Sequence, residues 1–129
     1  MNIFSNSRSF PSVKDKGKVG TYPALAKSGG GYFYDDVLEY RVWVHPANDE
    51  IRFWAFPGYP EALKFSQETE EAEAPLALVY QEECVDEPET GQYVHIKAPR
   101  IAEWQVDWLK GNKGTKKQIP EFLKKQQVG

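Results

Sequence analysis

Polar and apolar residues alternate without interruption along residues 38–45, and this pattern predicts a half-buried β-strand. The side expected to face the core carries Leu38, Tyr40, Val42 and Val44. The other side carries Glu39, Arg41, Trp43 and His45, a mixture unlike plain solvent-exposed surface. It is either a ligand-binding platform or a sheet surface stabilised by an ion pair, and the sequence leaves both interpretations open.

Four further segments have the pattern of strands. Residues 51–56 form a short aromatic run that we expect to pair with 38–45, and residues 76–81 are apolar on both sides, which predicts a central strand. Residues 93–97 alternate again. From residue 100 the alternation resumes, with Ala102, Trp104, Val106 and Trp108 expected inside and Glu103, Gln105 and Asp107 outside.

One segment has the pattern of a helix. Pro60 suits the first helical position and Glu61 suits the first turn, and the helix is expected to end before Pro75. Residues 82–91 are expected to form an acidic loop. The resulting order predicts an α+β fold: a single two-layer domain, with a mostly antiparallel sheet of about five strands, one main helix and irregular basic tails.

Length and composition favour one globular domain. The chain has 129 residues, of which 40% are hydrophobic and 27% are charged. Its single cysteine, Cys84, excludes an intramolecular disulfide and fits a reducing cytoplasm. No apolar run approaches the roughly 20 residues that span a bilayer, and the first thirty residues lack the apolar stretch of a secretory signal. We therefore expect a cytoplasmic protein with no membrane partner.

Charge divides the chain into three parts. The irregular N-terminal segment 1–31 and the C-terminal tail 110–129 are basic, whereas the core domain 32–109 has five basic residues against seventeen acidic ones. The tails either neutralise the acidic domain or are simply solvated, or else they contact nucleic acid or another polyanion. Repulsion between the acidic core domain and a phosphate backbone favours the first interpretation. Within the C-terminal tail, residues 120–125 are expected to form one helical turn that docks through Phe122 and Leu123.

The classical reactive residues are sparse. His45 and His95 have no third ligand at short spacing, so no metal site is expected. Cys84 lies among acidic neighbours that raise the pKa of a thiol, which argues against a nucleophilic cysteine. The run Ser28 to Gly31 precedes a strand instead of following one, so we interpret it as a linker and not as a phosphate-binding loop.

Arg41, His45, Tyr59, Ser66 and Glu103, in this order, resemble the arrangement of ADP-ribosyltransferase-like domains. The resemblance covers about 70 residues and implies NAD as the cofactor. It also implies that the basic residue binds the dinucleotide, that an aromatic or Ser-Thr element packs on nicotinamide, and that Glu103 polarises the ribose as the catalytic residue. The chain departs from the pattern in lacking a Ser-Thr-Ser element and in having Ile101 where a second Glu would stand.

A second resemblance covers nearly the whole chain. Residues 29–46, 75–79 and 100–104 are similar to a family of small, uncharacterised proteobacterial proteins whose members are often labelled GNAT-type acetyltransferases. That label implies acetyl-coenzyme A and an amine acceptor. Residues 32–109 have no Arg/Gln-x-x-Gly-x-Gly/Ala loop for the pyrophosphate, since Gly58 and Gly91 are the only glycines there.

A binding or regulatory module with no chemistry is the interpretation that the residues favour. Exposed rings such as Trp43 and Trp54 with charged rims suit a partner surface, and an Arg beside a Trp suits cation–π contact. The partner would be a protein or a small molecule; a transferase with a nucleotide-type cofactor is the alternative. The candidate ligand-binding residues are Arg41, Trp43, His45, Tyr59, Ser66 and His95.

Overall fold

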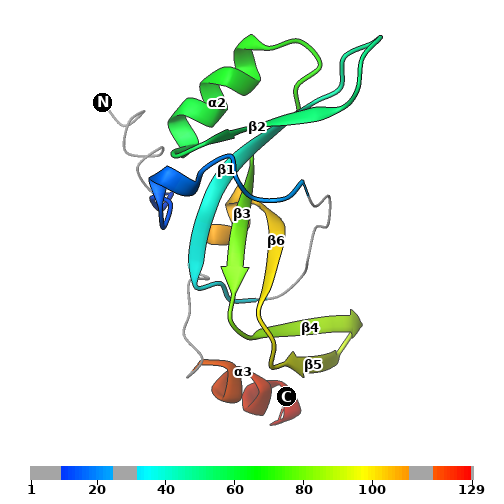
Figure 1. Cartoon of the computed structure of the whole chain (residues 1–129). Helices are drawn as coiled ribbons and strands as arrows, with labels where there is room; N and C mark the ends of the chain where they lie inside the picture. The colour runs from blue at the N-terminus through cyan, green and yellow to red at the C-terminus, as the bar shows by residue number, and fades with distance from the viewer. Residues whose placement is uncertain (1–9, 25–31, 111–117, 129) are drawn as a thin grey trace, which may run out of the picture.

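The computed structural model describes residues 10–24, 32–110 and 118–128 (Figure 1). The strands are β1 (Asp36–Val44), β2 (Arg52–Phe56), β3 (Leu76–Gln81), β4 (Cys84–Glu89), β5 (Gln92–Ile96) and β6 (Arg100–Gln105). The helices are α2 (Tyr59–Glu68) and α3 (Gln118–Val128), with short 3-10 helices η1 (Lys16–Lys18) and η2 (Val106–Leu109). None of the helices in these described ranges is long and apolar enough to cross a membrane.

The main sheet has the strand order β2-β1-β3-β6, and every neighbouring pair is antiparallel. The remaining two strands, β4 and β5, form a separate antiparallel hairpin. The α+β class expected from the sequence is confirmed, and so is the central position of residues 76–81, because β3 lies between β1 and β6.

A β-bulge interrupts β1 near its start. Val37 pairs with Val79, and Glu39 pairs with the next residue of β3, Leu78, so Leu38 is the extra residue. As a result Val37, and not Leu38, joins the main hydrophobic cluster, although Leu38 is also buried. Beyond the bulge the alternation follows the sequence prediction, with Tyr40 and Val42 fully buried on the core side.

The helix α2 covers the core side of the sheet (Figure 1). It begins after Gly58 with Pro60 at its start and Glu61 in its first turn, as the sequence predicts. Ala62 is fully buried against the sheet, and the Phe65 ring lies 5.2 Å from that of Phe56. Trp104 of β6 fills the same core with no exposed surface. Truncating a fully buried Trp to Ala typically costs about 3–5 kcal/mol, so this ring anchors β6.

Two strand predictions were wrong. Residues 84–89 form β4 instead of an acidic loop, because Cys84 and Val85 are buried and pair with Ile96 and His95 of β5. The last strand, β6, ends at Gln105, where the chain turns into η2. That turn buries Leu109 and leaves Trp108 38% exposed, although alternation predicted Trp108 inside.

The described part of the C-terminal tail forms α3, which is longer than the single turn expected there. Docking through Phe122 is confirmed, since this ring lies 4.7 Å from Tyr32, 5.6 Å from Phe33 and 5.5 Å from Tyr93. These four rings join α3 to the segment before β1 and to the β4–β5 hairpin. In Figure 1 α3 lies beside that hairpin, at the end of the molecule remote from α2.

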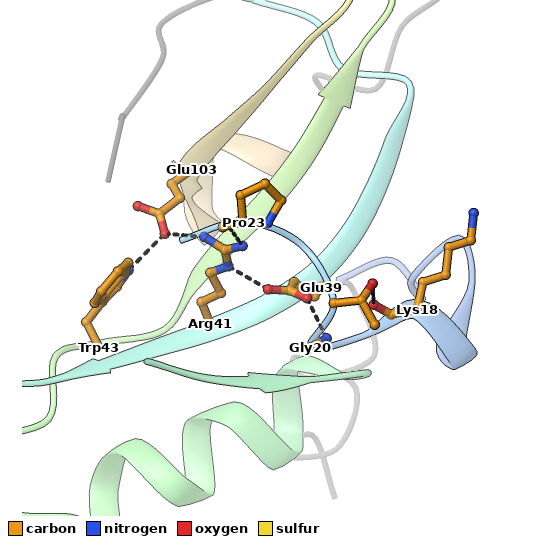
Figure 2. A network of polar contacts seen from close by, with 8 residues as sticks. Lys18, Gly20, Pro23, Glu39, Arg41, Trp43 and Glu103 are labelled. Atoms are coloured by element: carbon orange, nitrogen blue, oxygen red, sulfur yellow. Dashed lines mark hydrogen bonds and ion pairs between the residues drawn. The ribbon is translucent and has the colours of Figure 1, made fainter. Parts of the chain in front are cut away.

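Residues 10–24, here called the N-terminal strap, run along β1 and change sides of the sheet. At one end Phe10 packs on Tyr59 of α2, with ring centres 4.5 Å apart, and the Tyr40 hydroxyl donates to the Pro11 carbonyl. At the other end Pro23 lies on the opposite side of the sheet (Figure 2). The strap is irregular apart from η1, as expected, yet it belongs to the folded core because Val13 is buried.

Candidate functional site

A buried ion network lies on the side of the sheet opposite α2, and its centre is Arg41 (Figure 2). The Arg41 side chain has no exposed surface. Its Nε donates to Glu39 Oε2 at 2.5 Å, one terminal nitrogen donates to Glu103 Oε2 at 3.1 Å, and the other donates to the Pro23 carbonyl at 2.5 Å. Each guanidinium nitrogen therefore already bonds to a protein acceptor.

The sheet register explains why the two carboxylates meet one arginine. Leu78 of β3 pairs with Glu39 on one side and with Glu103 on the other, so these three side chains form one row across β1, β3 and β6. Residues two apart on a strand share a face. Arg41 therefore lies beside this row and reaches both acids.

Glu103 is buried, although alternation placed it on the solvent side: its exposed fraction is 4%. Its Oε2 accepts from Arg41 and also from the Trp43 indole nitrogen, at 2.8 Å. Its other oxygen, Oε1, points away from Arg41 and Trp43 in Figure 2, and none of the contacts drawn there reaches it. The structure thus brings together three of the predicted site residues: Arg41, Trp43 and Glu103.

The N-terminal strap closes the network from the side of Glu39. The backbone N–H of Gly20 donates to Glu39 Oε1 at 2.8 Å, and Gly20 has a φ of 89°, a conformation that glycine adopts readily. Burial is the largest cause that raises the pKa of the nearby Tyr22, followed by the negative charges of Asp15 and Glu39. The N-terminal strap is therefore joined to the Arg41 network through Glu39.

Aromatic rings flank the network on the β2 side. The Phe53 ring lies 4.2 Å from the Arg41 guanidinium carbon and 5.0 Å from the Trp43 ring. A guanidinium over an aromatic face gains cation–π attraction, and this gain grows when the pair is withdrawn from water. Burying charges is unfavourable unless they are paired and hydrogen-bonded, and the contacts of Arg41 meet both conditions.

The other predicted site residues lie elsewhere. His45, at the end of β1, pairs with Glu73, and both side chains are exposed. Tyr59 lies on the α2 side of the sheet, where burial is the largest cause raising its pKa, and the Ser66 hydroxyl donates to the Glu73 carbonyl at 2.7 Å. His95 pairs with Glu83 on the β4–β5 hairpin at 2.7 Å. The set that resembles an ADP-ribosyltransferase is therefore split between the two sides of the sheet.

Three contributors to the network were missed as site residues: Glu39, Phe53 and the strap. Glu39 had a detectable signal, since an acid two residues before an arginine on the same strand face can pair with it. Pro23 contributes a backbone carbonyl from 18 residues away, and no side-chain pattern could reveal that contact.

The hairpin carries a second feature, an open groove of about 330 Å³ lined by Asp86, Glu87, Pro88, Val94 and Ile96. Cys84, nearby on β4, is buried, and burial is the largest cause that raises the pKa of its thiol. Among the residues that the structure describes, no three His, Cys, Asp or Glu side chains are grouped so as to hold a metal ion.

The chain matches no protein-family model, no curated protein and no solved structure. A functional conclusion therefore rests on the geometry of the site.

Proposed function

We propose that this chain is a small binding module without catalytic activity, and that it contacts its partner through the surface formed by Trp43, Phe53 and Glu103, here called the network face. One observation carries the proposal. The Arg41 side chain has no exposed surface and its three nitrogens bond to Glu39, Glu103 and Pro23, so Arg41 orients the network face instead of binding the ligand itself.

The network face has features of a recognition surface. The Trp43 ring is half-buried, and its indole N–H is held by Glu103. A ring held in one orientation loses little conformational entropy on binding, and Trp is enriched among residues that dominate binding energy.

The transferase alternative has less support from the geometry. A dinucleotide-binding role for Arg41 would require it to exchange protein acceptors for phosphate oxygens. A nicotinamide-packing role for Tyr59 or Ser66 would place cofactor contacts on the side of the sheet away from Glu103. NAD is therefore not expected to bind, and the lack of a pyrophosphate-binding loop in residues 32–109 argues likewise against acetyl-coenzyme A.

The partner that we propose is a protein or a small molecule and not nucleic acid, because the core domain carries a large excess of acidic residues. We place the module in the cytoplasm, since its one cysteine is buried and has no cysteine with which to form an intramolecular disulfide.

The test compares two tryptophan variants in affinity purification from lysate. Trp43→Ala should lose the associated molecule, whereas Trp54→Ala should keep it, because Trp54 is exposed but packs on Phe65 on the α2 side. Circular dichroism checks that both variants fold. Equal association by both variants, or none by the wild-type chain, would count against the module.

Thermal unfolding distinguishes the binding module from the transferase alternative. A ligand present at 100 times its dissociation constant adds about 2.7 kcal/mol of stability, which raises Tm measurably. We expect no rise with NAD or with acetyl-coenzyme A. A rise with either cofactor would replace the module by a transferase.

A further inference from the structure

One oxygen of Glu103 has no partner among the described residues. Both of the carboxylate's hydrogen bonds, from Arg41 and from Trp43, end on Oε2. Oε1 lies on the same side of Arg41 as the Trp43 ring, away from the strap (Figure 2). A carboxylate oxygen can accept up to two hydrogen bonds, so Oε1 keeps unused acceptor capacity in a residue that is only 4% exposed.

The charges of the network do not balance. Among the described residues, Glu39 and Glu103 are the two acids that bond to Arg41, and Arg41 is the one basic side chain that bonds to them, which leaves one negative charge in excess there. A buried charge in excess of its partners is unfavourable, and a positive group that reaches it from outside is correspondingly favoured. An anion at the same place would be repelled.

The Trp43 ring lies next to the Glu103 carboxylate. Its indole N–H is donated to Glu103 Oε2, so a cation bound at this carboxylate lies next to the indole N–H of Trp43. The small exposed fraction of Glu103 limits the approach to the narrow end of an extended group. A carboxylate oxygen without a partner among the described residues, beside the edge of an aromatic ring, suits the end of a long basic side chain.

We infer that the network face binds the positively charged end of an arginine or lysine side chain from a partner protein, with Glu103 Oε1 accepting its N–H groups next to the Trp43 indole. This inference rests on the proposed function and names the partner's chemistry at the same site. Arg41 is a positioning residue, since it holds the Glu103 carboxylate in place without touching the ligand.

Nuclear magnetic resonance of the full chain tests the inference through the indole N–H groups of its four tryptophans. The probe is n-butylguanidinium, and n-butylurea, its uncharged analogue, is the control at equal ionic strength. The Trp43 resonance is assigned from its loss in Trp43→Phe. We expect n-butylguanidinium to shift the Trp43 resonance saturably, n-butylurea to leave it in place, and the other three indole resonances to stay unchanged.

Two variants identify the acid. Glu103→Gln should weaken n-butylguanidinium binding by about tenfold or more, since it replaces a charge-assisted hydrogen bond by a neutral one. Glu83→Gln is the matched control, because Glu83 is a partly buried acid paired with His95 on the separate hairpin. The affinity of this variant for n-butylguanidinium should stay within about twofold of wild type. If Glu103→Gln fails to fold, the comparison of n-butylguanidinium with n-butylurea on the wild-type chain still tests whether the site binds a positive charge.

Three results would overturn the inference: no saturable shift with n-butylguanidinium, an equal shift with n-butylurea, or the same shift with sodium chloride alone. The module itself is judged separately. If the associated molecule is lost in Trp43→Ala but n-butylguanidinium does not bind, the module stands and the basic side chain is wrong. If n-butylguanidinium binds but no association depends on Trp43, the cation site stands and the module fails.

Discussion

Arg41 on β1 and Glu103 on β6 form an ion pair at 3.1 Å, although β3 lies between their strands. The arginine spans this strand because the row of Glu39, Leu78 and Glu103 crosses the sheet next to it. One side chain therefore connects β1 with β6 and, through the Pro23 carbonyl, with the N-terminal strap.

Replacing Arg41 by methionine should strongly destabilise the fold. The substitution keeps a long apolar side chain but leaves two buried carboxylates without their cation, which typically costs about 3–5 kcal/mol. Urea unfolding at neutral pH measures the loss. The control is Arg52→Met, which breaks an exposed pair with Asp49 and should cost at most about 1 kcal/mol. Equal losses in the two variants would show that the Arg41 network contributes no more than a surface pair.

Gly20→Ala should destabilise the strap by about 1–2 kcal/mol, because the φ of 89° places a side chain in a strained conformation. No atom lies within 4 Å of the added Cβ, so the effect reports backbone conformation and not a clash. Gly20→Asn should cost less, since Asn tolerates positive φ better than Ala. Urea midpoints of the two variants compare them, and an Ala variant as stable as the Asn variant would contradict the prediction.

Tyr32 should contribute stability that disappears in alkali. A hydrogen bond to Glu87 is the largest cause that raises the pKa of Tyr32 from 10.0 to about 12. Since the folded state holds this proton more tightly than the unfolded state, the contribution is complete below about pH 10 and is lost as the pH rises through about 12.

The stability difference between wild type and Tyr32→Phe should therefore shrink over that pH range, as measured by urea unfolding at several pH values. Glu87→Gln gives the control for the cause. Removing the carboxylate should move the pKa of Tyr32 back toward 10.0, which tyrosinate absorbance can follow. A high pKa that survives Glu87→Gln would assign the shift to burial, the second cause.

Phe122→Ala should release α3 without unfolding the main sheet. The Phe122 ring joins the helix to Tyr32, Phe33 and Tyr93, and these contacts lie away from the cluster around Trp104. Hydrogen exchange should accelerate in α3 and stay slow in β1 and β3. Lys124→Ala, which alters an exposed position of the same helix, should leave both rates unchanged. Faster exchange in β1 would mean that α3 supports the whole fold.

The sequence predicted the elements whose apolar pattern is local. Alternation placed Tyr40, Val42 and Val44 in the core, and an apolar run placed 76–81 at the centre of the sheet. Alternation failed where tertiary contacts decide. Val85 is buried in a strand although acids and Pro88 surround it in the sequence. Trp108 is exposed because it lies in η2 and not in a continuation of β6.

The candidate site was predictable only in part. An ion pair involving Arg41 was one of two interpretations of the mixed strand face, and the structure contains it. Which acids would pair could not be read from the sequence, because the meeting of Glu39 and Glu103 depends on the register of β3 with both of its neighbours. The contribution of Pro23 depends on the path of an irregular segment, which has no periodicity to detect.

The bulge in β1 determines where this chain tolerates a change of length. A one-residue deletion between Glu39 and Val44 would invert the orientation of the side chains on one side of the gap and would bring Arg41 or its apolar neighbours to the wrong face. Deleting Leu38 would instead remove the extra residue and leave Val37 and Glu39 on the faces that they already occupy. Deleting Leu38 should therefore be compatible with the native sheet, whereas a single-residue deletion across 40–43 should not.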